Sequence, residues 1–437
     1  MKIRSTFWGV LIVLVIGIVG VFWTRTQGLS EDQVRIFYQL IYLCTLLIIL
    51  SAIWTFFSVR GITIMRSARG LHQQLGQIFE ERFELFNTSR ISHPYLEVRD
   101  EAVLFRKGGS RVISWIAPHE KRNYNSYTYL SKRGEFSLGP TVLFSGDPFG
   151  LFSYTRRLPA EKSLLVLPHT VDLEYFPFPP GLLPGGRALH RKTSEPTPHA
   201  AGVREYVPGD PRNRIHWPST ARRNRMMVKE FDQDPQADVW IFLDSQKKIQ
   251  VEQNTLLDIP EIDQLWLIKH NLEVALPADT YEYAVSIAAS VSKYFIEAGQ
   301  SVGMASAGQG VTVLPAERGD RQLGKILENL AFLRGDGKLP LHGIIQAQVP
   351  HLPRGSIVVI ITCSTEETVE VAIDELNLRS LRPIIVLIDP SSFGGDSNSE
   401  FLASRFEQKQ IPYVLVSKGD NLKEVLEHGF IGSPFTL

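Results

Sequence analysis

The chain has 437 residues, 44% hydrophobic and 21% charged, which excludes disorder as its main state and predicts two or three folded domains. Lys plus Arg and Asp plus Glu number 46 each, so the formal net charge is zero and no global field would draw the chain onto nucleic acid. Its two cysteines, Cys44 and Cys363, lie outside any C-x-x-C pattern, which argues against a disulfide framework and a thiolate zinc site.

Two long uncharged segments near the N-terminus predict a membrane anchor over residues 1–62. As helices, Phe7–Trp23 and Ile36–Val59 are long enough to cross a hydrocarbon layer of about 30 Å. No small-residue cleavage site follows Trp23, and a second apolar segment comes soon after it, so an anchor is favoured over a cleaved signal peptide.

The Lys and Arg residues that flank these segments predict their orientation. Lys2 and Arg4 precede the first segment and three arginines follow the second, whereas the two arginines of the short loop between them are offset by two acids. By the positive-inside rule both termini, and with them the large soluble part, lie in the cytoplasm of a multi-pass protein of the cell membrane.

The middle of the chain divides into three predicted segments. Residues 63–94 carry apolar residues near helical spacing and predict a stalk helix; these residues are Leu71, Leu75, Ile78, Phe79 and Phe83. Residues 95–175 contain short apolar runs separated by Gly and Pro, which predicts a small all-β, sandwich-like domain with a structural role. Residues 176–200 are rich in Pro and Gly and predict a linker.

Residues 201–437 predict an α/β domain. Apolar runs typical of buried strands alternate with runs of helical spacing. The predicted strands are 239–243, 301–305, 357–361, 384–388 and 413–416, and the predicted helices are 281–295, 322–333, 366–378, 401–408 and 422–427. Such alternation predicts an open, mainly parallel sheet covered by helices on both faces. Ligands of such sheets bind at the carboxyl ends of the strands, where Asp244 and Thr362 stand.

Signatures of common enzyme chemistry are missing from the sequence. It has no G-x-x-x-x-G-K-[ST], no G-x-G-x-x-G after a strand, no H-E-x-x-H and no G-x-S-x-G. An ATPase or a NAD enzyme is therefore excluded, and we expect a protein without catalytic residues.

The polar segment from Gly202 to Phe231 is the most informative part of the chain. Pro208-Gly209-Asp210-Pro211 predicts a tight turn between two elements. Seven cations surround it, with Tyr206 and Trp217 as aromatic neighbours; they are Arg204, Arg212, Arg214, Arg222, Arg223, Arg225 and Lys229. Two roles remain open at this point: docking of an acidic partner or a phosphate group, or internal pairing of an arginine with Glu205 or Asp210 that holds the turn.

This segment closely resembles the signature of a bacterial family known as domain of unknown function fifty-eight. The matching residues are Arg204, Glu205, Tyr206, Gly209, Asp210, Arg212 or Arg214, Ile215, His216 and Trp217. A second segment, 133–140 followed by 147–152, also resembles the family, and two N-terminal spans, a strand-rich middle and an α/β end are similar to its usual architecture.

The resemblance implies a fold and a partner. Members of this family are expected to be membrane-anchored partners of MoxR-type AAA+ ATPases, often encoded beside transglutaminase-like membrane proteins. Their α/β part is similar to a von Willebrand factor A domain, which often holds Mg²⁺ through D-x-S-x-S and a later Thr and Asp. In this chain Asp244 is kept, but Gln246 and Lys248 stand at the two serine positions. A single carboxylate beside two lysines is a poor site for a hard cation, so we expect no tightly bound metal and at most weak Mg²⁺ binding at Asp244 and Thr362.

Four hypotheses follow for the function. The favoured one is a membrane-anchored scaffold that recruits an AAA+ ATPase for assembly or remodelling. The alternative is a magnesium-dependent, adhesion-type binding protein that uses Asp244 and Thr362. A hydrolase would use His216 or Cys363 and would need these two residues near each other in a pocket. Nucleic-acid binding through residues 204–229 is the least favoured hypothesis.

Overall fold

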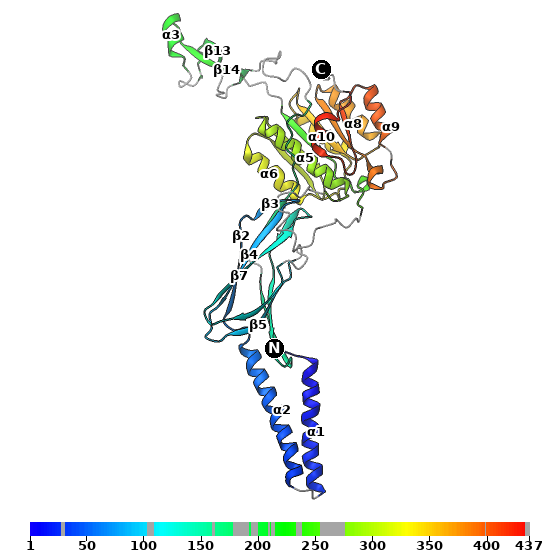
Figure 1. The fold of residues 1–437 in the computed structure, drawn as a ribbon. Helices are drawn as coiled ribbons and strands as arrows, with labels where there is room; N and C mark the ends of the chain where they lie inside the picture. The colour runs from blue at the N-terminus through cyan, green and yellow to red at the C-terminus, as the bar shows by residue number, and fades with distance from the viewer. Residues whose placement is uncertain are drawn as a thin grey trace. The chain divides into compact units, whose positions relative to one another are not determined.

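A computed structural model describes residues 1–27, 31–102, 109–159, 162–177, 192–193, 200–208, 210, 215–232, 238–253, 276–397 and 399–432. The described residues form two compact units, one from residues 1–167 and one from residue 168 onward (Figure 1). Residues 103–108 of the predicted all-β segment, most of the predicted linker, and residues 254–275 of the predicted α/β domain lie outside the described residues.

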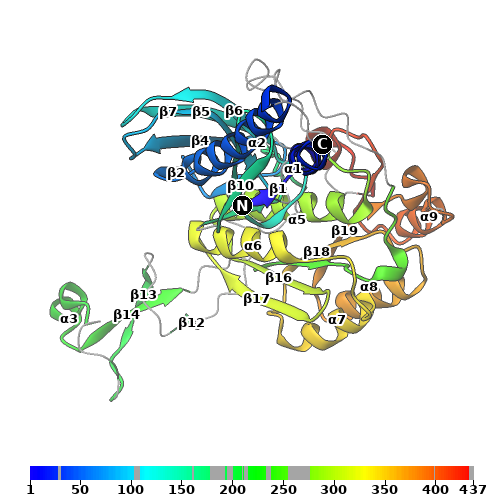
Figure 2. The ribbon, with the colours of Figure 1, turned by 90° about the horizontal axis from the view of Figure 1, so that it is seen from below.

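The first unit begins with two long helices, α1 (Ser5–Thr26) and α2 (Glu31–Phe57), which lie side by side (Figures 1 and 2). Both are long and apolar enough to cross a membrane, and most of their side chains are not covered by protein. They approach closely at Gly20, where a Cβ atom would lie 2.4 Å from the ring of Phe37. The two predicted helical segments are thus confirmed as helices.

Three antiparallel or mixed sheets make up the rest of the first unit. Their orders are β1-β10-β9-β5-β6, β2-β4-β7 and β3-β11-β8. The strands are β1 (Lys2–Ile3), β2 (Ile62–Ala68), β3 (His72–Gln74), β4 (Ile78–Asn87), β5 (His93–Asp100), β6 (Arg111–Ile116), β7 (Lys121–Tyr129), β8 (Gly134–Ser137), β9 (Thr141–Gly146), β10 (Phe152–Leu158) and β11 (Ser163–Leu167). The predicted all-β segment is therefore confirmed as strand-rich.

The predicted stalk helix over 63–94 is wrong, because this stretch forms β2, β3, β4 and the start of β5. In β4 alternate side chains are buried, from Phe79 through Glu81 and Phe83 to Leu85 and Asn87, which is the period of a strand. Glu81 conceals that period in the sequence, because a carboxylate stands where an apolar residue is expected. The β region thus begins at residue 62 and not at 95.

The second unit is built on a six-stranded sheet of order β17-β16-β15-β18-β19-β20, in which only the edge strand β17 is antiparallel. Its strands are β15 (Val239–Leu243), β16 (Val302–Ala307), β17 (Val311–Glu317), β18 (Ile357–Thr362), β19 (Arg382–Ile388) and β20 (Tyr413–Val416). Its helices are α5 (Thr280–Glu297), α6 (Asp320–Phe332), α7 (Leu341–Gln348), α8 (Thr368–Leu378), α9 (Glu400–Gln408) and α10 (Leu422–His428), with short 3₁₀ turns at 247–249, 349–351 and 390–393. All predicted strands and helices of this unit are confirmed to within a few residues, whereas β17 and α7 were not predicted.

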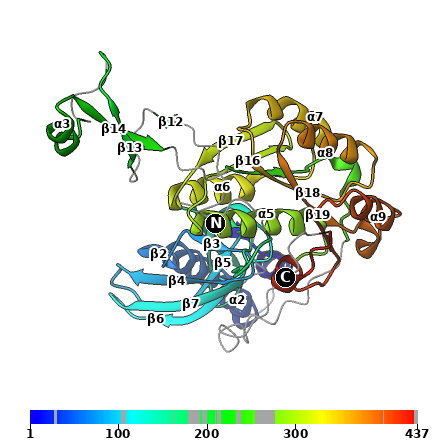
Figure 3. The same cartoon turned by 90° about the horizontal axis from the view of Figure 1, so that it is seen from above.

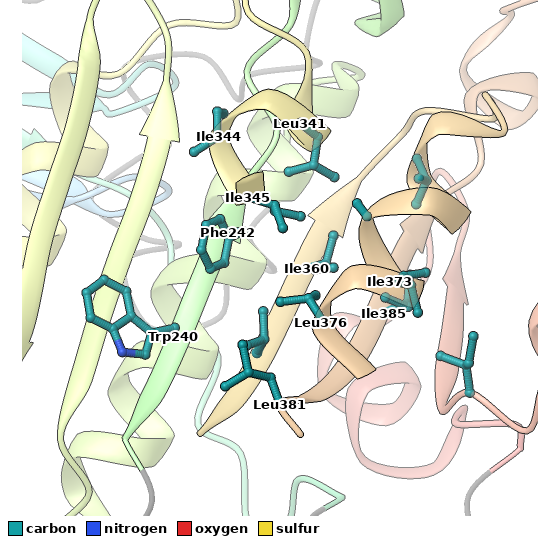
Figure 4. Packing of buried hydrophobic residues seen from close by; sticks show 14 of the residues in the cluster. Trp240, Phe242, Leu341, Ile344, Ile345, Ile360, Ile373, Leu376, Leu381 and Ile385 are labelled. Carbon is teal, nitrogen blue, oxygen red and sulfur yellow. The ribbon is translucent and has the colours of Figure 1, made fainter. Parts of the chain in front are cut away.

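Helices cover both faces of this sheet, with α5 and α6 on one face and α7 and α8 on the other (Figure 3). Alternate residues of β15, Trp240 and Phe242, point to the face of α7 and α8, where they join a large apolar cluster (Figure 4). Every residue of β15 and β18 is buried, as expected of a central parallel strand covered on both sides. The start of the predicted linker also belongs to this unit, because the buried ring of Phe176 packs 5.5 Å from that of Phe295.

Candidate functional site

The signature segment folds into a hairpin, here called the signature hairpin. Strands β13 (Ala200–Glu205) and β14 (Met227–Asp232) pair antiparallel, and the short helix α3 (Trp217–Arg223) lies in the connection between them. The two-residue strand β12 (Lys192–Thr193) adds to the outer edge of β14. Figure 1 shows α3 at the tip of this hairpin.

An internal ion pair shapes the turn of the signature hairpin. Arg204 Nη1 and Nη2 donate to the two carboxylate oxygens of Asp210 at 2.7 Å each. Asp210 Oδ2 also accepts from the backbone N–H of Val207 at 2.9 Å, and Arg204 donates to the carbonyl of Glu205. A planar guanidinium that meets a carboxylate with two parallel bonds fixes geometry as well as charge. The internal role left open for Arg204 and Asp210 is therefore realised in this fold.

His216 caps the N-terminus of α3. Its Nδ1 accepts from the backbone N–H of Ser219 at 3.3 Å and lies 2.7 Å from the Ser219 hydroxyl. The backbone N–H of His216 donates to the carbonyl of Met227, and the hydroxyl of Thr220 in α3 accepts from the backbone N–H of Met227. Each of these partners of His216 belongs to the hairpin, whereas the thiol of Cys363 contacts Ile249, in the 3₁₀ turn at 247–249. No described contact joins the two residues that a hydrolase would need together.

Met227 and Val228 of the signature hairpin are buried, whereas several of its other side chains are exposed. Trp217 is 66% exposed and Val207 57%, and the hairpin's exposed cations are Arg222, Arg223, Arg225 and Lys229. The backbone N–H of Tyr206 donates to the carbonyl of Met226, which extends the strand pairing. Of the other signature residues, Glu205 is exposed and approaches Arg225 at 3.5 Å. Gly209, Arg212 and Arg214 lie outside the described residues.

The second candidate site lies at the carboxyl edge of the six-stranded sheet. Asp244 follows β15 and Thr362 ends the neighbouring parallel strand β18, so the parallel register brings them together. The Thr362 hydroxyl donates to Asp244 Oδ2 at 2.7 Å, and the backbone N–H of Gln246 donates to Oδ1 at 3.2 Å. Asp244 is 1% exposed, and burial raises its pKa to about 6 against the opposing effect of these hydrogen bonds.

Neutral polar groups surround this pair. The hydroxyl of Ser245 lies 2.8 Å from that of Tyr281 and 2.6 Å from that of Ser306. The thiol of Cys363 is 3% exposed and donates to the carbonyl of Ile249 at 3.2 Å. Burial raises the pKa of this thiol, so the nucleophilic thiolate is disfavoured.

The donors at this edge fit a hard divalent cation poorly. Mg²⁺ requires near-octahedral oxygen coordination and usually more than one anionic ligand. Both oxygens of Asp244 already accept hydrogen bonds from the protein, and Gln246 and Lys248 occupy the positions at which the related motif carries serine. Among the described residues, no three His, Cys, Asp or Glu side chains converge on one point. We therefore derive no chemistry through a metal here.

Sequence reasoning missed a third polar residue at the same edge. Asp389 follows β19, and its carboxylate accepts from the hydroxyls of Ser391 at 2.6 Å and Ser399 at 2.7 Å. Burial opposes ionisation, but these hydrogen bonds prevail and lower the pKa of Asp389. An acid directly after the buried run Ile384–Ile388 was the signal that could have identified it.

Comparisons with known proteins agree with the sequence resemblance. Residues 202–255 match the model of the family described as "Protein of unknown function DUF58". The chain is 23% identical over 273 residues to "Uncharacterized protein YeaD" of Bacillus subtilis (strain 168), a match that covers 61% of this chain and 60% of that relative.

Similarities to solved structures are weak. Proximal thread matrix protein 1 from the mussel byssus aligns with a TM-score of 0.28 and 12% identity over 44% of this chain and 46% of that one. A β-glucosidase from Listeria innocua aligns with a TM-score of 0.14 and 8% identity over 23% of this chain and 16% of that one. Neither similarity bears on function. The segment that carries the signature hairpin and the Asp244 loop is thus similar to the DUF58 family, and the resemblance predicted from the sequence is confirmed.

Proposed function

We propose that this protein is a membrane-anchored, non-enzymatic scaffold whose soluble units bind a MoxR-type AAA+ ATPase in an assembly or remodelling system. In this proposal α1 and α2 anchor the chain in the cytoplasmic membrane, and the signature hairpin is the docking element. The six-stranded sheet is proposed to be a von Willebrand factor A-like domain, for which its helix-covered parallel strands and antiparallel edge strand are support. A transglutaminase-like membrane protein is a further proposed partner.

The pairing of the N-terminal residues supports the anchor. Lys2 and Ile3 form β1, which pairs with β10, so the residues before α1 and those after α2 join the same β unit. Two spans that leave and return to one folded unit must place it on a single side of the bilayer. The excess of Lys and Arg beside the outer ends of the helices favours the cytoplasmic side.

The observation that carries the docking proposal is that one arginine of the signature hairpin forms an internal ion pair while others are exposed to solvent. Arg204 pairs with Asp210 and shapes the turn, whereas Arg222 and Arg223 at the end of α3 are exposed, as is the indole of Trp217 at its start. Arginine and tryptophan are enriched among the residues that dominate binding energy at protein interfaces. A surface of this kind suits a partner with an acidic, partly apolar face.

A pull-down of the detergent-solubilised full chain from its native lysate, with ATP present, tests the proposal. Wild type is expected to retain an AAA+ ATPase of the MoxR type, identified by mass spectrometry. Arg222→Glu/Arg223→Glu/Arg225→Glu is expected to weaken retention at least about tenfold, because it reverses three exposed charges at the docking surface. A matched control, Lys338→Glu/Arg379→Glu, reverses exposed cations elsewhere on the second unit and is expected to retain the ATPase.

The variant Arg204→Ala/Asp210→Ala distinguishes the effect of the exposed charges on docking from the effect of the hairpin's conformation. It leaves the exposed cations in place but removes the ion pair that holds the turn, so retention is expected to fall while the rest of the unit stays folded. Equal retention of the ATPase by wild type and the triple charge reversal would contradict docking through the hairpin. Absence of any AAA+ ATPase from the wild-type sample would contradict the proposed partner.

The alternative class, a magnesium-dependent binder at Asp244 and Thr362, receives less support from the site. The hydroxyl of Thr362 donates a hydrogen bond to the carboxylate and accepts one from the backbone N–H of Ser364, so most of its bonding capacity is used within the protein. Titration calorimetry with Mg²⁺ and Mn²⁺ decides it: micromolar binding that Asp244→Ala abolishes would favour this class over the scaffold.

A further inference from the structure

We propose that the end of the β unit nearest α1 and α2 is a second membrane-contact surface, which rests on anionic phospholipid headgroups and inserts three apolar side chains between them. This end, here called the membrane-proximal face, consists of three turns, 88–92, 147–151 and 117–120 with the strand end at 115–116, in which residues 91, 149 and 115 are exposed. The inference rests on the proposal that α1 and α2 span a bilayer.

Contacts with α1 fix the position of turn 147–151 relative to the membrane. The hydroxyl of Thr6, in the first turn of α1, donates to the carbonyl of Gly150, and the backbone N–H of Arg4 donates to the carbonyl of Leu151 at 2.9 Å. The ring of Phe7 lies 5.3 Å from that of Phe152. Turn 147–151 therefore lies level with the start of the apolar helix, where hydrocarbon gives way to headgroups.

Contacts with the end of α2 fix the position of turns 88–92 and 117–120 relative to the membrane. The ring of His93 hydrogen-bonds through Nδ1 to the carbonyl of Ser58, directly after α2. In the sheet His93 faces Ile116, the neighbour of Trp115. Asn87 then joins the two turns, because its side-chain amide donates to the carbonyls of Ile91 and Ala117. Two independent sets of contacts thus place all three turns at the level where the helices leave the membrane.

Each of the three turns exposes a large apolar side chain. Phe149 is 55% exposed, Trp115 54% and Ile91 51%. Trp115 has a φ of 69°, a left-handed conformation that is costly for a bulky residue and that no burial of its indole compensates. Aromatic residues at this height are typical of the interfacial belts of membrane proteins.

The charges at this face match an acidic lipid surface. Lys2, Arg4, Arg60 and Arg90 are exposed around it. Its two acids are already engaged: Asp147 accepts from three backbone N–H groups of its own turn and the next strand, and Glu120 pairs with Arg122 at 2.7 Å. Basic residues close to an anionic leaflet are attracted to it, so four of them favour contact with such a surface.

Site-directed fluorescence on the reconstituted full chain tests the inference. In a chain with Cys44 and Cys363 replaced by alanine, single cysteines replace Phe149, Trp115 or Ile91 and carry an environment-sensitive dye. The vesicles contain phosphatidylcholine with or without phosphatidylglycerol. We expect stronger quenching by spin-labelled lipid than by aqueous iodide at these three positions, and a larger blue shift with phosphatidylglycerol.

Two reference positions separate this inference from the anchor itself. Lys132 follows β7 at its end away from Lys121, and a dye at Lys132→Cys is expected to respond to iodide only. Ile12 lies in the middle of α1, and a dye at Ile12→Cys is expected to respond to lipid only. If Ile12→Cys responds to lipid but the three test positions behave as Lys132→Cys does, the membrane-proximal face is refuted and the anchor stands. If Ile12→Cys responds to iodide, both proposals are overturned.

Two variant sets test the chemistry of the contact. Arg60→Glu/Arg90→Glu is expected to abolish the effect of phosphatidylglycerol on a dye at Phe149→Cys, and an unchanged effect would overturn the headgroup part of the inference. Trp115→Gly removes the indole while giving the left-handed position the residue that adopts it freely, so it is expected to fold and to reduce the lipid quenching of the dye at Phe149→Cys. Full lipid quenching in this variant would overturn the insertion of the indole.

Discussion

Replacement of Arg66 by methionine tests how the β unit is held together. Arg66 of β2 donates to Glu81 Oε2 of β4 at 2.9 Å and to Asp100 Oδ1 of β5 at 3.1 Å, and so ties two sheets of this unit to each other. The side chains of Glu81 and Asp100 are 2% and 1% exposed, and the guanidinium also lies 4.6 Å from the ring centre of Phe83. Burial raises the pKa of Glu81 even beside this arginine.

The expected cost follows from what remains after the substitution. Methionine fills part of the volume but leaves two buried carboxylates without their cation. Removal of one partner of a buried ion pair costs about 3–5 kcal/mol, because the charge left behind has lost its compensation. Since 1.4 kcal/mol corresponds to a factor of ten, amide protection in β4 and β5 is expected to fall by about 10² to 10⁴.

Peptide-resolved hydrogen exchange of the detergent-solubilised full chain measures this fall, with β18 as an internal reference. Arg82→Met is the matched control on β4, because Arg82 is 52% exposed and pairs with an exposed Glu84; it is expected to cost at most about 1 kcal/mol. Arg66→Met/Glu81→Gln/Asp100→Asn removes the charges together and is expected to regain most of the protection. If Arg66→Met exchanges like Arg82→Met, or if the triple variant exchanges faster than Arg66→Met, the reasoning about uncompensated charge is wrong.

Three further substitutions test other parts of the fold. Burial raises the pKa of Asp244 from 3.8 to about 6, so the second unit should lose on the order of 3 kcal/mol of stability as the pH rises from about 4 to about 6. Asp244→Asn should flatten this pH dependence, measured by urea unfolding followed by pulse-labelled exchange of β18. An unchanged pH dependence in the variant refutes the assignment. Gly337→Ala would place a Cβ atom 2.0 Å from the carbonyl oxygen of Ala307 and is expected to cost about 3 kcal/mol of stability, measured by hydrogen exchange in β15 and β16. Gly310→Ala, which has open space around it, should cost little. Equal amide protection in the two variants contradicts the packing argument. Gly20→Val would collide with the ring of Phe37 and should separate α1 from α2, seen as loss of a crosslink between cysteines placed on the two helices, while Gly9→Val, which meets nothing, should keep it.

The sequence was most informative where one physical requirement dominates. A central parallel strand must be apolar on both faces, and the central strands β15 and β18 were predicted with nearly their final bounds. Edge elements obey weaker constraints. In β17 only alternate residues are partly covered and Pro315 interrupts the run, and α7 is short and contains Gly343, so neither carries a strong pattern.

Burial of charge explains the largest error. Glu81 and Asp100 are polar in the sequence and buried in the fold, because Arg66 reaches them from a strand that is distant in the chain. A pattern of neighbouring residues in the sequence cannot include Arg66 as the partner of these acids, so the sequence of β4 was interpreted as part of a stalk helix. The same limit applied to the signature hairpin, where a tight turn was foreseen but α3 and its His216 cap were not.

The two candidate sites differ in what their polar groups leave available. At the sheet edge Asp244 accepts a hydrogen bond from the hydroxyl of Thr362, and Asp389 accepts hydrogen bonds from those of Ser391 and Ser399, so the protein itself satisfies these carboxylates. In the signature hairpin one arginine is neutralised by Asp210, while the cations on α3 and after it remain exposed beside an uncovered indole. Groups that have already formed their interactions within the chain contribute little binding energy, so the proposed docking role fits the outer face of the hairpin better than the sheet edge.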